Sequence, residues 1–332
     1  MSKPRIALVV TGGTIDTLGE GRLDLFEYAR HQRWLTPLEL LASVPELQEM
    51  ADIMLVEMPR FGVSTFSISD WVALHAAISS AVDAGAEGVV VTQGSNYVEE
   101  NAYFLSLTLK TASPVVLTAA MRPASGMGSD GAMNLVDAVR VALDPASHAH
   151  GVTVVMNGRI HAARDVTKGH TQALEAFHSL QSGPLGELLP NGSVVYFRHG
   201  LKLHTLDTPF HITSFSVADW PRVEILAACY GGDGALAEAA LQLGARGLVC
   251  VGFGAGRPGP GLHGVLCKAA TNGIPVVLSA RANGRVTAYR ALNKQGFIAA
   301  NDLTPWKARI LLQLALVHAN DVRSFQDIFD GF

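Results

Sequence analysis

The chain has 332 residues, of which 48% are apolar and only 16% are charged, and its formal net charge is −4. This slight negative charge and the scattered Lys and Arg residues argue against nucleic acid as a partner. No apolar run is long enough to span a membrane, the three cysteines lack metal-ligand spacing, and the first strand begins too early for a signal peptide. We therefore predict a cytoplasmic protein that binds neither a membrane nor a metal.

The first strand and the turn after it carry the first candidate site. Residues 6–10 are aliphatic, as in a strand that is buried on both faces of a parallel sheet. The strand leads to Gly12 and Gly13, which permit a tight turn, and then to Thr14. A hydroxyl in this place lies at the carboxyl end of a strand, where open α/β sheets bind ligands. Thr14 is either a nucleophile or only a helix N-cap.

A segment rich in glycine and charge, residues 16–33, follows the turn, and loops of this length are often active-site lids. Thr36 and Pro37 then predict the start of a helix, as its N-cap and first residue. Strands and helices alternate from there to residue 156. Strands are predicted at 53–58, 88–92, 114–118 and 152–156, and helices at 71–84, 101–109 and 132–143.

The alternation breaks after residue 183 and resumes near residue 221. We therefore predict a larger N-terminal domain over residues 1–185 that carries the active-site loops, a linker over 186–220, and a smaller C-terminal domain over 221–332. Strands alternating with helices at this spacing are typical of mainly parallel sheets flanked by helices, so the predicted fold class is α/β.

Three further loops follow predicted strands. Residues 92–96, with the sequence TQGSN, precede a helix whose N-terminus would favour a carboxylate, although Ser95 or Asn96 could be only the helix cap. The next loop spans residues 119–131. The last contains Lys168, which is a candidate base if it is desolvated in a cleft and an ordinary solvated side chain if it is not.

Taken together, the motifs of these loops resemble those of the bacterial L-asparaginase/glutaminase family. The resemblance covers nearly the whole chain in order. The matching segments are Thr11-Gly12-Gly13-Thr14-Ile15, Glu99-Glu100, Ala120-Met121-Arg122-Pro123, Ser129-Asp130-Gly131, Arg164-Asp165-Val166-Thr167-Lys168, Gly183-Pro184-Leu185-Gly186 and the tail helix from Lys307 to Leu316. The resemblance implies an asparaginase-like fold with two α/β domains. It also implies a homotetramer, a dimer of dimers, in which a neighbouring subunit completes each active site.

The resemblance also implies catalytic roles. Thr14 takes the position of the nucleophile, and Tyr28 in the lid is the candidate for the tyrosine that activates it. Ser95 takes the position of a second active-site hydroxyl, and Lys168 that of the lysine that can deprotonate it. A weak hydroxyl nucleophile needs such an adjacent base. Which of the two hydroxyls attacks the substrate stays open.

Substrate-binding positions follow from the same resemblance. Backbone N–H groups near Gly13 and Gly94 can hold an oxyanion. Ala120 supplies a backbone carbonyl to the leaving group, and Asn96 lies where the family binds the substrate. Neither a cofactor nor a metal is implied.

Three departures from the family pattern concern the α-ammonium group of the substrate. Asn96 replaces an aspartate that binds this group, and Ala255 lies near the place of an asparagine from the partner subunit. Residues 283–293 contain no acid where the family has a glutamate. A buried ammonium without a carboxylate partner is strongly disfavoured. A lid acid, Glu20 or Glu27, would remove this difficulty if it reached the vacant place.

We therefore predict an asparaginase-family hydrolase for a small anionic substrate, a carboxylate-bearing amide or cyclic amide or thioamide without a free α-amino group. One such substrate is a thiohydantoin propionate, in which ring attack would expel sulfide by breaking a C–S bond. The alternative is an ordinary L-asparaginase or glutaminase that releases ammonia. A second alternative is a non-catalytic protein that binds a small molecule on the same fold.

Overall fold

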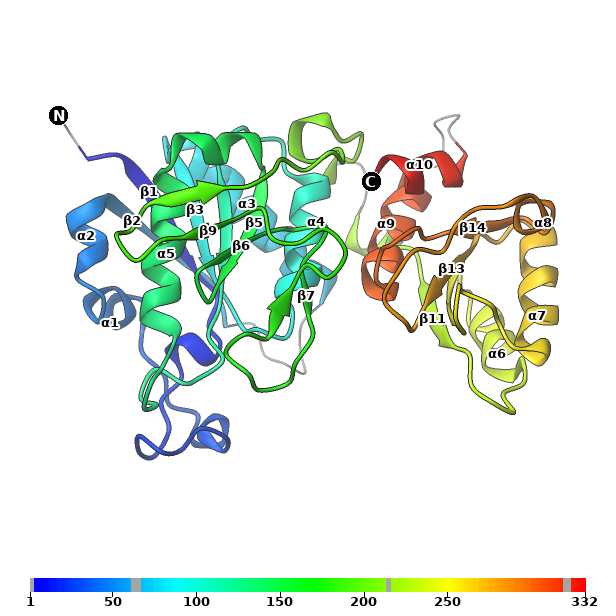
Figure 1. Cartoon of the computed structure of the whole chain (residues 1–332), viewed down its shortest axis with the longest axis horizontal. Coiled ribbons are helices and arrows are strands. Elements are labelled where there is room, and N and C mark those ends of the chain that lie inside the picture. The colour runs from blue at the N-terminus through cyan, green and yellow to red at the C-terminus, as the bar shows by residue number, and fades with distance from the viewer. Residues whose placement is uncertain (1–2, 61–66, 213–215, 319–323) are drawn as a thin grey trace. The chain divides into compact units, whose positions relative to one another are not determined.

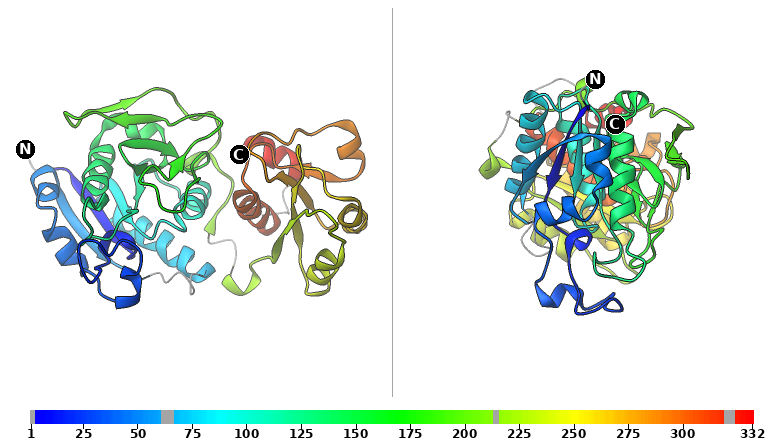
Figure 2. Two further views of the ribbon diagram at one scale, coloured as in Figure 1. Left: turned by 60° about the horizontal axis from the view of Figure 1, so that its bottom comes forward. Right: turned by 90° about the vertical axis from the view of Figure 1, so that its left-hand side faces the viewer.

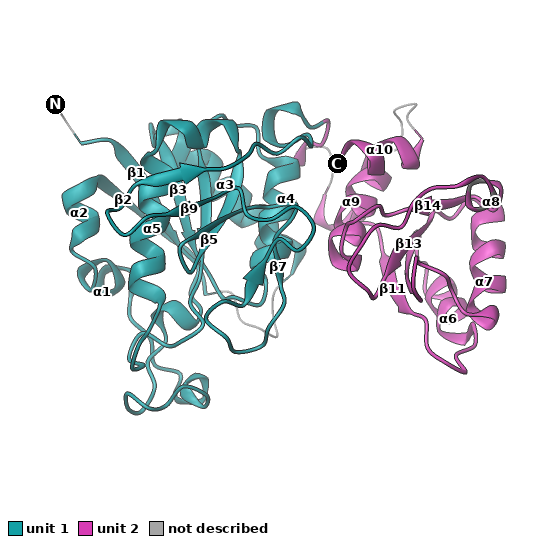
Figure 3. Cartoon of the chain, viewed as in Figure 1, with its two compact units in different colours: residues 1–208 teal, residues 209–332 magenta. Residues whose placement is uncertain are grey.

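The computed structural model describes residues 3–60, 67–212, 216–318 and 324–332. The chain divides into two compact units, unit 1 over Met1–Thr208 and unit 2 over Pro209–Phe332 (Figure 3). Each unit contains a mainly parallel sheet with helices, which confirms the predicted α/β class. The boundaries predicted for separate domains, 1–185 and 221–332, stay predictions.

Unit 1 is built on an eight-stranded sheet in the order β10-β9-β6-β5-β4-β3-β1-β2 (Figure 1). Strands β1 to β5 pair in parallel, and β6, β9 and β10 continue the sheet in antiparallel pairs. The bounds are β1 (Arg5–Val10), β2 (Asp52–Glu57), β3 (Gly88–Thr92), β4 (Val115–Thr118), β5 (Val152–Met156), β6 (Arg159–Ala162), β9 (Gly186–Leu188) and β10 (Val194–Tyr196).

Helices cover both faces of this sheet (Figure 2). Residues 6–10 of β1 are all buried, as predicted, so both faces of the strand contribute to the core. Its even-numbered side chains share an apolar core with residues of three helices, α1 (Pro37–Ala42), α2 (Glu46–Met50) and α5 (Gly131–Leu143). Two further helices, α3 (Ile68–Asp83) and α4 (Val98–Thr108), cover the opposite face (Figure 2).

The helix starts follow local hydrogen bonds. Thr36 caps α1 as predicted: its hydroxyl accepts the N–H of Glu39 at 3.2 Å, and the Glu39 carboxylate accepts the N–H of Thr36 at 2.7 Å. Helix α3 begins three residues before the predicted position, because Ser67 donates its N–H to the carboxylate of Asp70 at 2.6 Å. The Ser67 hydroxyl donates to the same carboxylate at 2.9 Å, and Ser67 is the N-cap of the helix.

Within the predicted linker over 186–220, residues 186–188 and 194–196 form β9 and β10 of the large sheet. The carbonyl oxygen of Val195 fills the place that a Cβ at Gly186 would take, so a glycine is needed for this strand pairing. Short strands joined by turns interrupt the alternation of strand and helix. In the sequence this interruption resembles a linker.

Unit 2 contains a four-stranded parallel sheet in the order β11-β12-β13-β14. Among the helices in the described parts of the chain, none is long and apolar enough to cross a membrane. The bounds in unit 2 are β11 (Val223–Ala227), α6 (Ala235–Gln242), β12 (Gly247–Gly252), α7 (Pro260–Thr271), β13 (Val276–Ala280), α8 (Arg290–Lys294), β14 (Phe297–Ala299), α9 (Pro305–Val317) and α10 (Phe325–Gly331).

A buried histidine in unit 1 stacks against the segment that follows β10. The ring of His150 lies between those of Tyr196 and His199, with centroid distances of 4.1 Å and 4.9 Å. Neither ring nitrogen of His150 has a hydrogen-bond partner among the described residues. Burial, and after it the charges of His199, His204 and Arg198, lowers the pKa of His150 to about 4.

We expect His150 to make unit 1 less stable in mild acid. The unfolded chain protonates this side chain below pH 6.5 and the folded chain only near pH 4, so the free energy of unfolding falls as the pH decreases through this window. His150→Phe keeps a ring but cannot titrate, and should remove about 2 kcal/mol of that fall at pH 4.5. Urea unfolding of both proteins at pH 7 and pH 4.5 measures the effect. An equal loss of stability in both would contradict it.

Candidate active site

The ends of two neighbouring parallel strands, β1 and β3, bring the predicted hydroxyls to one place. Thr14 begins a short 3-10 helix directly after the glycine turn, and Ser95 lies between β3 and α4. At Gly13 φ is +132°, and a Cβ there would lie 2.5 Å from the backbone nitrogen of Gly94. Because only glycine readily accepts both constraints, Gly13 is what lets the two loops touch.

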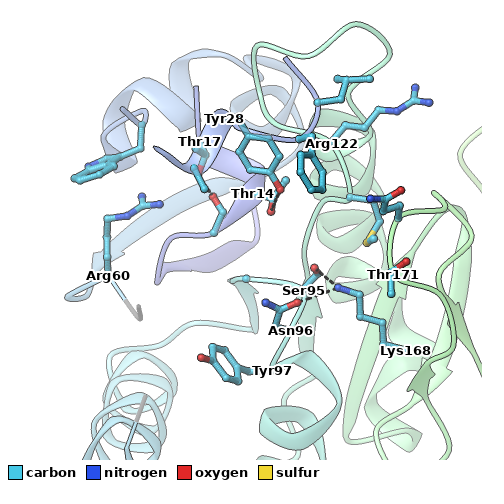
Figure 4. Close-up of a pocket in the computed structure, with 18 of the residues that line it drawn as sticks. Thr14, Thr17, Tyr28, Arg60, Ser95, Asn96, Tyr97, Arg122, Lys168 and Thr171 are labelled. Atoms are coloured by element: carbon cyan, nitrogen blue, oxygen red, sulfur yellow. Dashed lines mark hydrogen bonds between the residues drawn. The ribbon is translucent and has the colours of Figure 1, made fainter. Parts of the chain in front are cut away.

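Both loops open into one cavity of about 830 Å³, a volume typical of a small-molecule site. Figure 4 shows the side chains that face it. Every described residue of its wall belongs to unit 1. All of the predicted site residues except Ala120 lie on this wall: Gly13, Thr14, Tyr28, Gly94, Ser95, Asn96 and Lys168.

The first hydroxyl pair joins Thr14 to the lid. The Oγ1 atom of Thr14 lies 3.1 Å from the phenolic oxygen of Tyr28 (Figure 4). The lid is shaped by Asp24, whose carboxylate accepts the N–H groups of Glu20 at 3.1 Å and Glu27 at 3.0 Å. Neither of these two glutamates belongs to the described wall of the cavity. In this structure the lid therefore brings a phenol, and no acid, to Thr14.

The second pair joins Ser95 to a lysine. The Nζ atom of Lys168 donates to Ser95 Oγ at 2.8 Å and to Asn96 Oδ1 at 3.1 Å (Figure 4). The backbone N–H of Lys168, in β7 (Thr167–Lys168), donates to the carboxylate of Glu99 at 2.8 Å, which fixes the start of the side chain. Burial lowers the pKa of Lys168, and the charge of Glu99 partly opposes this. A lysine with a lowered pKa is better suited to accept a proton.

The loop after β4 is fixed by hydrogen bonds to residues that do not line the cavity. The carboxylate of Asp130 accepts the N–H groups of Met121 at 3.0 Å and Arg122 at 2.9 Å, and Asn134 donates to it at 3.0 Å. Met121 and Arg122 reach the cavity wall, whereas Ala120 is fully buried behind it. A role of the Ala120 carbonyl in binding stays a prediction.

Two groups of residues that support the loops of the site were not predicted from the sequence. The first is a chain of two buried hydrogen bonds: Trp71 donates to Asn101 at 2.7 Å, and Asn101 donates to Gln93 at 2.9 Å. It ties the loop of Ser95 to α3 and α4. The second group is the buried carboxylate of Asp16, which pairs with Arg60. An acid next to the buried turn was the one signal in the sequence, since such a group needs a partner.

No metal site emerges: among the described residues, no three or more His, Cys, Asp or Glu side chains are grouped to hold an ion. Two of the hydroxyls on the cavity wall have partners suited to proton transfer, one beside a phenol and one beside a lysine of lowered pKa. Glycine turns lie next to both. This set of groups is suited to acyl transfer through a hydroxyl nucleophile.

Comparison with known proteins agrees with this class. The family model "Asparaginase, N-terminal" matches residues 5–201, and "Glutaminase/Asparaginase C-terminal domain" matches residues 222–329. The chain is 37% identical over 332 residues to a probable periplasmic L-asparaginase of Haemophilus influenzae, covering 99% of this chain and 93% of that protein. It is 35% identical over 336 residues to L-asparaginase 2 of Escherichia coli, covering 100% and 94%.

A solved structure agrees over the same length. The probable cytoplasmic L-asparaginase from Campylobacter jejuni has a TM-score of 0.90 and 35% sequence identity, with 99% of this chain and 100% of that chain covered. The chain belongs to the asparaginase family, as its motifs predicted, and is a hydrolase.

We expect the lysine of the cavity to titrate below the usual range for lysine. Glu99→Gln should lower the pKa of Lys168 further, because it removes a charge that stabilises the ammonium but keeps an oxygen to accept the backbone N–H. Side-chain NMR of isotope-labelled lysine measures the pKa of Lys168 in both proteins. A Lys168 pKa at or above 10.5, the usual value for lysine, or one raised by Glu99→Gln, would contradict this assignment.

Proposed function

We propose that this chain hydrolyses the side-chain amide of L-asparagine and releases ammonia. The observation that carries the proposal is that Thr14–Tyr28 and Ser95–Lys168 face one cavity in a chain of the asparaginase family. The names of the relatives, L-asparaginase in bacteria, support the substrate. They give no support to a thiohydantoin substrate or to the release of sulfide.

In the proposed reaction, the Oγ1 atom of Thr14 attacks the amide carbon while its proton passes to the phenolic oxygen of Tyr28, and the phenol gives its own proton to the amide nitrogen. Backbone N–H groups of the two glycine turns stabilise the oxyanion. The C–N bond then breaks, ammonia leaves with the returned proton, and an ester to Thr14 remains. Water hydrolyses the ester to the carboxylate product. Lys168 donates to Ser95 in its charged form, and once it has lost a proton it can accept the proton of that hydroxyl, so the pair can move protons in the site.

A second candidate substrate is a carboxylate-bearing amide without a free α-amino group. The observation in its favour is that the described wall contains no Asp or Glu side chain, while Asn96 offers only a neutral amide that already accepts from Lys168. An ammonium group bound there would lose water without gaining an ion pair. The other two departures from the family pattern, Ala255 and residues 283–293, lie in unit 2, and neither contains an Asp or Glu residue.

We also propose a homo-oligomer in the cytoplasm, with the tetramer that the family resemblance implies. Relatives named for the periplasm and for the cytoplasm both match this chain. Light scattering of the purified protein measures the number of subunits.

The experiment that tests the function compares ammonia release from L-asparagine and from succinamate, which carries the same amide but lacks the amino group. The proposed function predicts turnover of L-asparagine with the higher kcat/KM. A preference for succinamate supports the second candidate, and no ammonia from either amide contradicts both. Thr14→Ala should lower kcat by about 10³-fold or more, since it removes the attacking atom.

We expect Asn96→Asp to raise kcat/KM for L-asparagine relative to succinamate by about tenfold, because a carboxylate attracts the ammonium of one substrate and repels the anion of the other. The same change places a negative charge next to Lys168 and raises its pKa. The two substrates are therefore compared at pH 7 and pH 9, so that loss of the base is distinguished from a change in binding. An unchanged ratio at both pH values would show that position 96 does not contact the amino group.

A further inference from the structure

Arg60 enters the cavity from the end of β2, the edge strand next to β1. Its guanidinium donates from Nη1 to Asp16 Oδ2 at 2.6 Å and from Nη2 to Asp16 Oδ1 at 2.9 Å. The Asp16 side chain is 1% exposed, whereas that of Arg60 is 32% exposed and belongs to the cavity wall. The arginine is therefore anchored on one edge in the protein and open to the cavity on another.

Two further contacts fix the plane of this guanidinium. Its central carbon lies 4.5 Å from the centroid of the Trp34 ring, which places the cation over an aromatic face. On another side it lies against the glycine turn: a Cβ at Gly12 would come within 2.8 Å of the same carbon. Since Gly12 is two residues before Thr14, the guanidinium lies against the turn that leads to the candidate nucleophile.

A guanidinium has five N–H donors, and the two bonds to Asp16 use only two of them. A planar cation held in this way is preorganised for a carboxylate, which it can bind through two parallel hydrogen bonds. The wall has two other cations, Arg122 and Lys168. Lys168 donates to Ser95. Arg122 donates to the backbone of its own loop, to the carbonyl oxygen of Gly128 at 3.0 Å.

In the view of Figure 4, Arg60 and Lys168 lie on opposite sides of Thr14. We propose that Arg60 is a specificity-determining residue that binds a carboxylate of the substrate, with Asp16 and Trp34 as positioning residues that hold its guanidinium. The proposal rests on the proposed function and adds to it how the cavity selects an anionic amide. A substrate anchored by its carboxylate at Arg60 would extend its amide carbon toward Thr14.

The test uses two amides that differ only in charge, succinamate and the neutral succinamide. Wild-type protein should prefer succinamate, and Arg60→Met should lower kcat/KM for succinamate by about 30-fold, mainly through KM, with at most a threefold change for succinamide. Arg5→Met is the matched control, because Arg5 pairs with Asp52 at the opposite end of β1 and β2. Equal losses for both amides in Arg60→Met would overturn the proposal.

Removing Arg60 leaves Asp16 buried without its partner, which can unfold the protein. The double variant Asp16→Asn/Arg60→Met removes both charges, and Arg60→Lys keeps the charge without the two-point contact. Both should lose the preference for succinamate while circular dichroism shows a folded chain. A preference retained in the folded double variant, or lost only in Arg122→Met, would place the carboxylate elsewhere.

Succinate binding, measured by calorimetry, separates this proposal from the proposed function, because it needs no turnover. Wild-type protein should bind succinate and Arg60→Lys should bind it at least tenfold more weakly. If ammonia is released from no amide but succinate binding still depends on Arg60, the catalytic proposal fails and the carboxylate site stands. If wild-type protein and Arg60→Lys bind succinate equally, the carboxylate site is wrong whatever the activity.

Discussion

The site depends on the close contact between two glycine turns. Parallel pairing of β1 with β3 brings their carboxyl ends together, and the backbone of Gly13 then packs directly against that of Gly94. A side chain at Gly13 would push the loops apart by the thickness of a methyl group. Because Thr14 and Ser95 follow these glycines at once, their spacing is set by this backbone contact and not by flexible side chains.

The group that contacts each hydroxyl, and that we propose activates it, comes from a more distant part of the chain. Tyr28 comes from the lid, which is shaped by bonds to Asp24, and Lys168 comes from a short strand fixed by Glu99. Each hydroxyl thus has a partner on a separate element. No hydrogen bond in the described part of the chain links Tyr28 to the Ser95–Lys168 pair, so each pair is held by its own contacts.

Charge is distributed unevenly in the cavity. Its described wall carries the cations Arg60, Arg122 and Lys168 and no carboxylate, while the acids that support it, Asp16 and Glu99, are buried behind it. Such a cavity favours an anion over a cation, because an anion gains several charge-assisted hydrogen bonds when it loses its water. In the proposed function, this uneven charge selects for a substrate that carries a carboxylate.

Local patterns in the sequence were sufficient for much of the fold. The aliphatic runs of β1 and β3, and the capping residues of α1, depend on neighbours a few positions apart, so their prediction needed no tertiary information. The placement of Gly13, Thr14, Ser95 and Lys168 on one wall was expected from motifs that resemble a known family.

Contacts between distant residues could not be predicted in this way. Arg60 and Asp16 are 44 positions apart, and nothing near either residue indicates the other. The strands β9 and β10 pair through short segments with no helix between them, so their membership of the large sheet depends on tertiary contacts. The burial of Ala120 is set by Asp130 and Asn134, which hold the loop from behind.

The proposed mechanism requires that Thr14 forms an ester with the substrate. Acid quenching during turnover of L-asparagine, followed by mass spectrometry of the digested protein, measures where an acyl group is attached. We predict an acyl adduct on the peptide that contains Thr14, and no adduct in Thr14→Ala. An adduct on the peptide that contains Ser95 would contradict this mechanism. Turnover in the presence of hydroxylamine without capture of an acyl product would also contradict it.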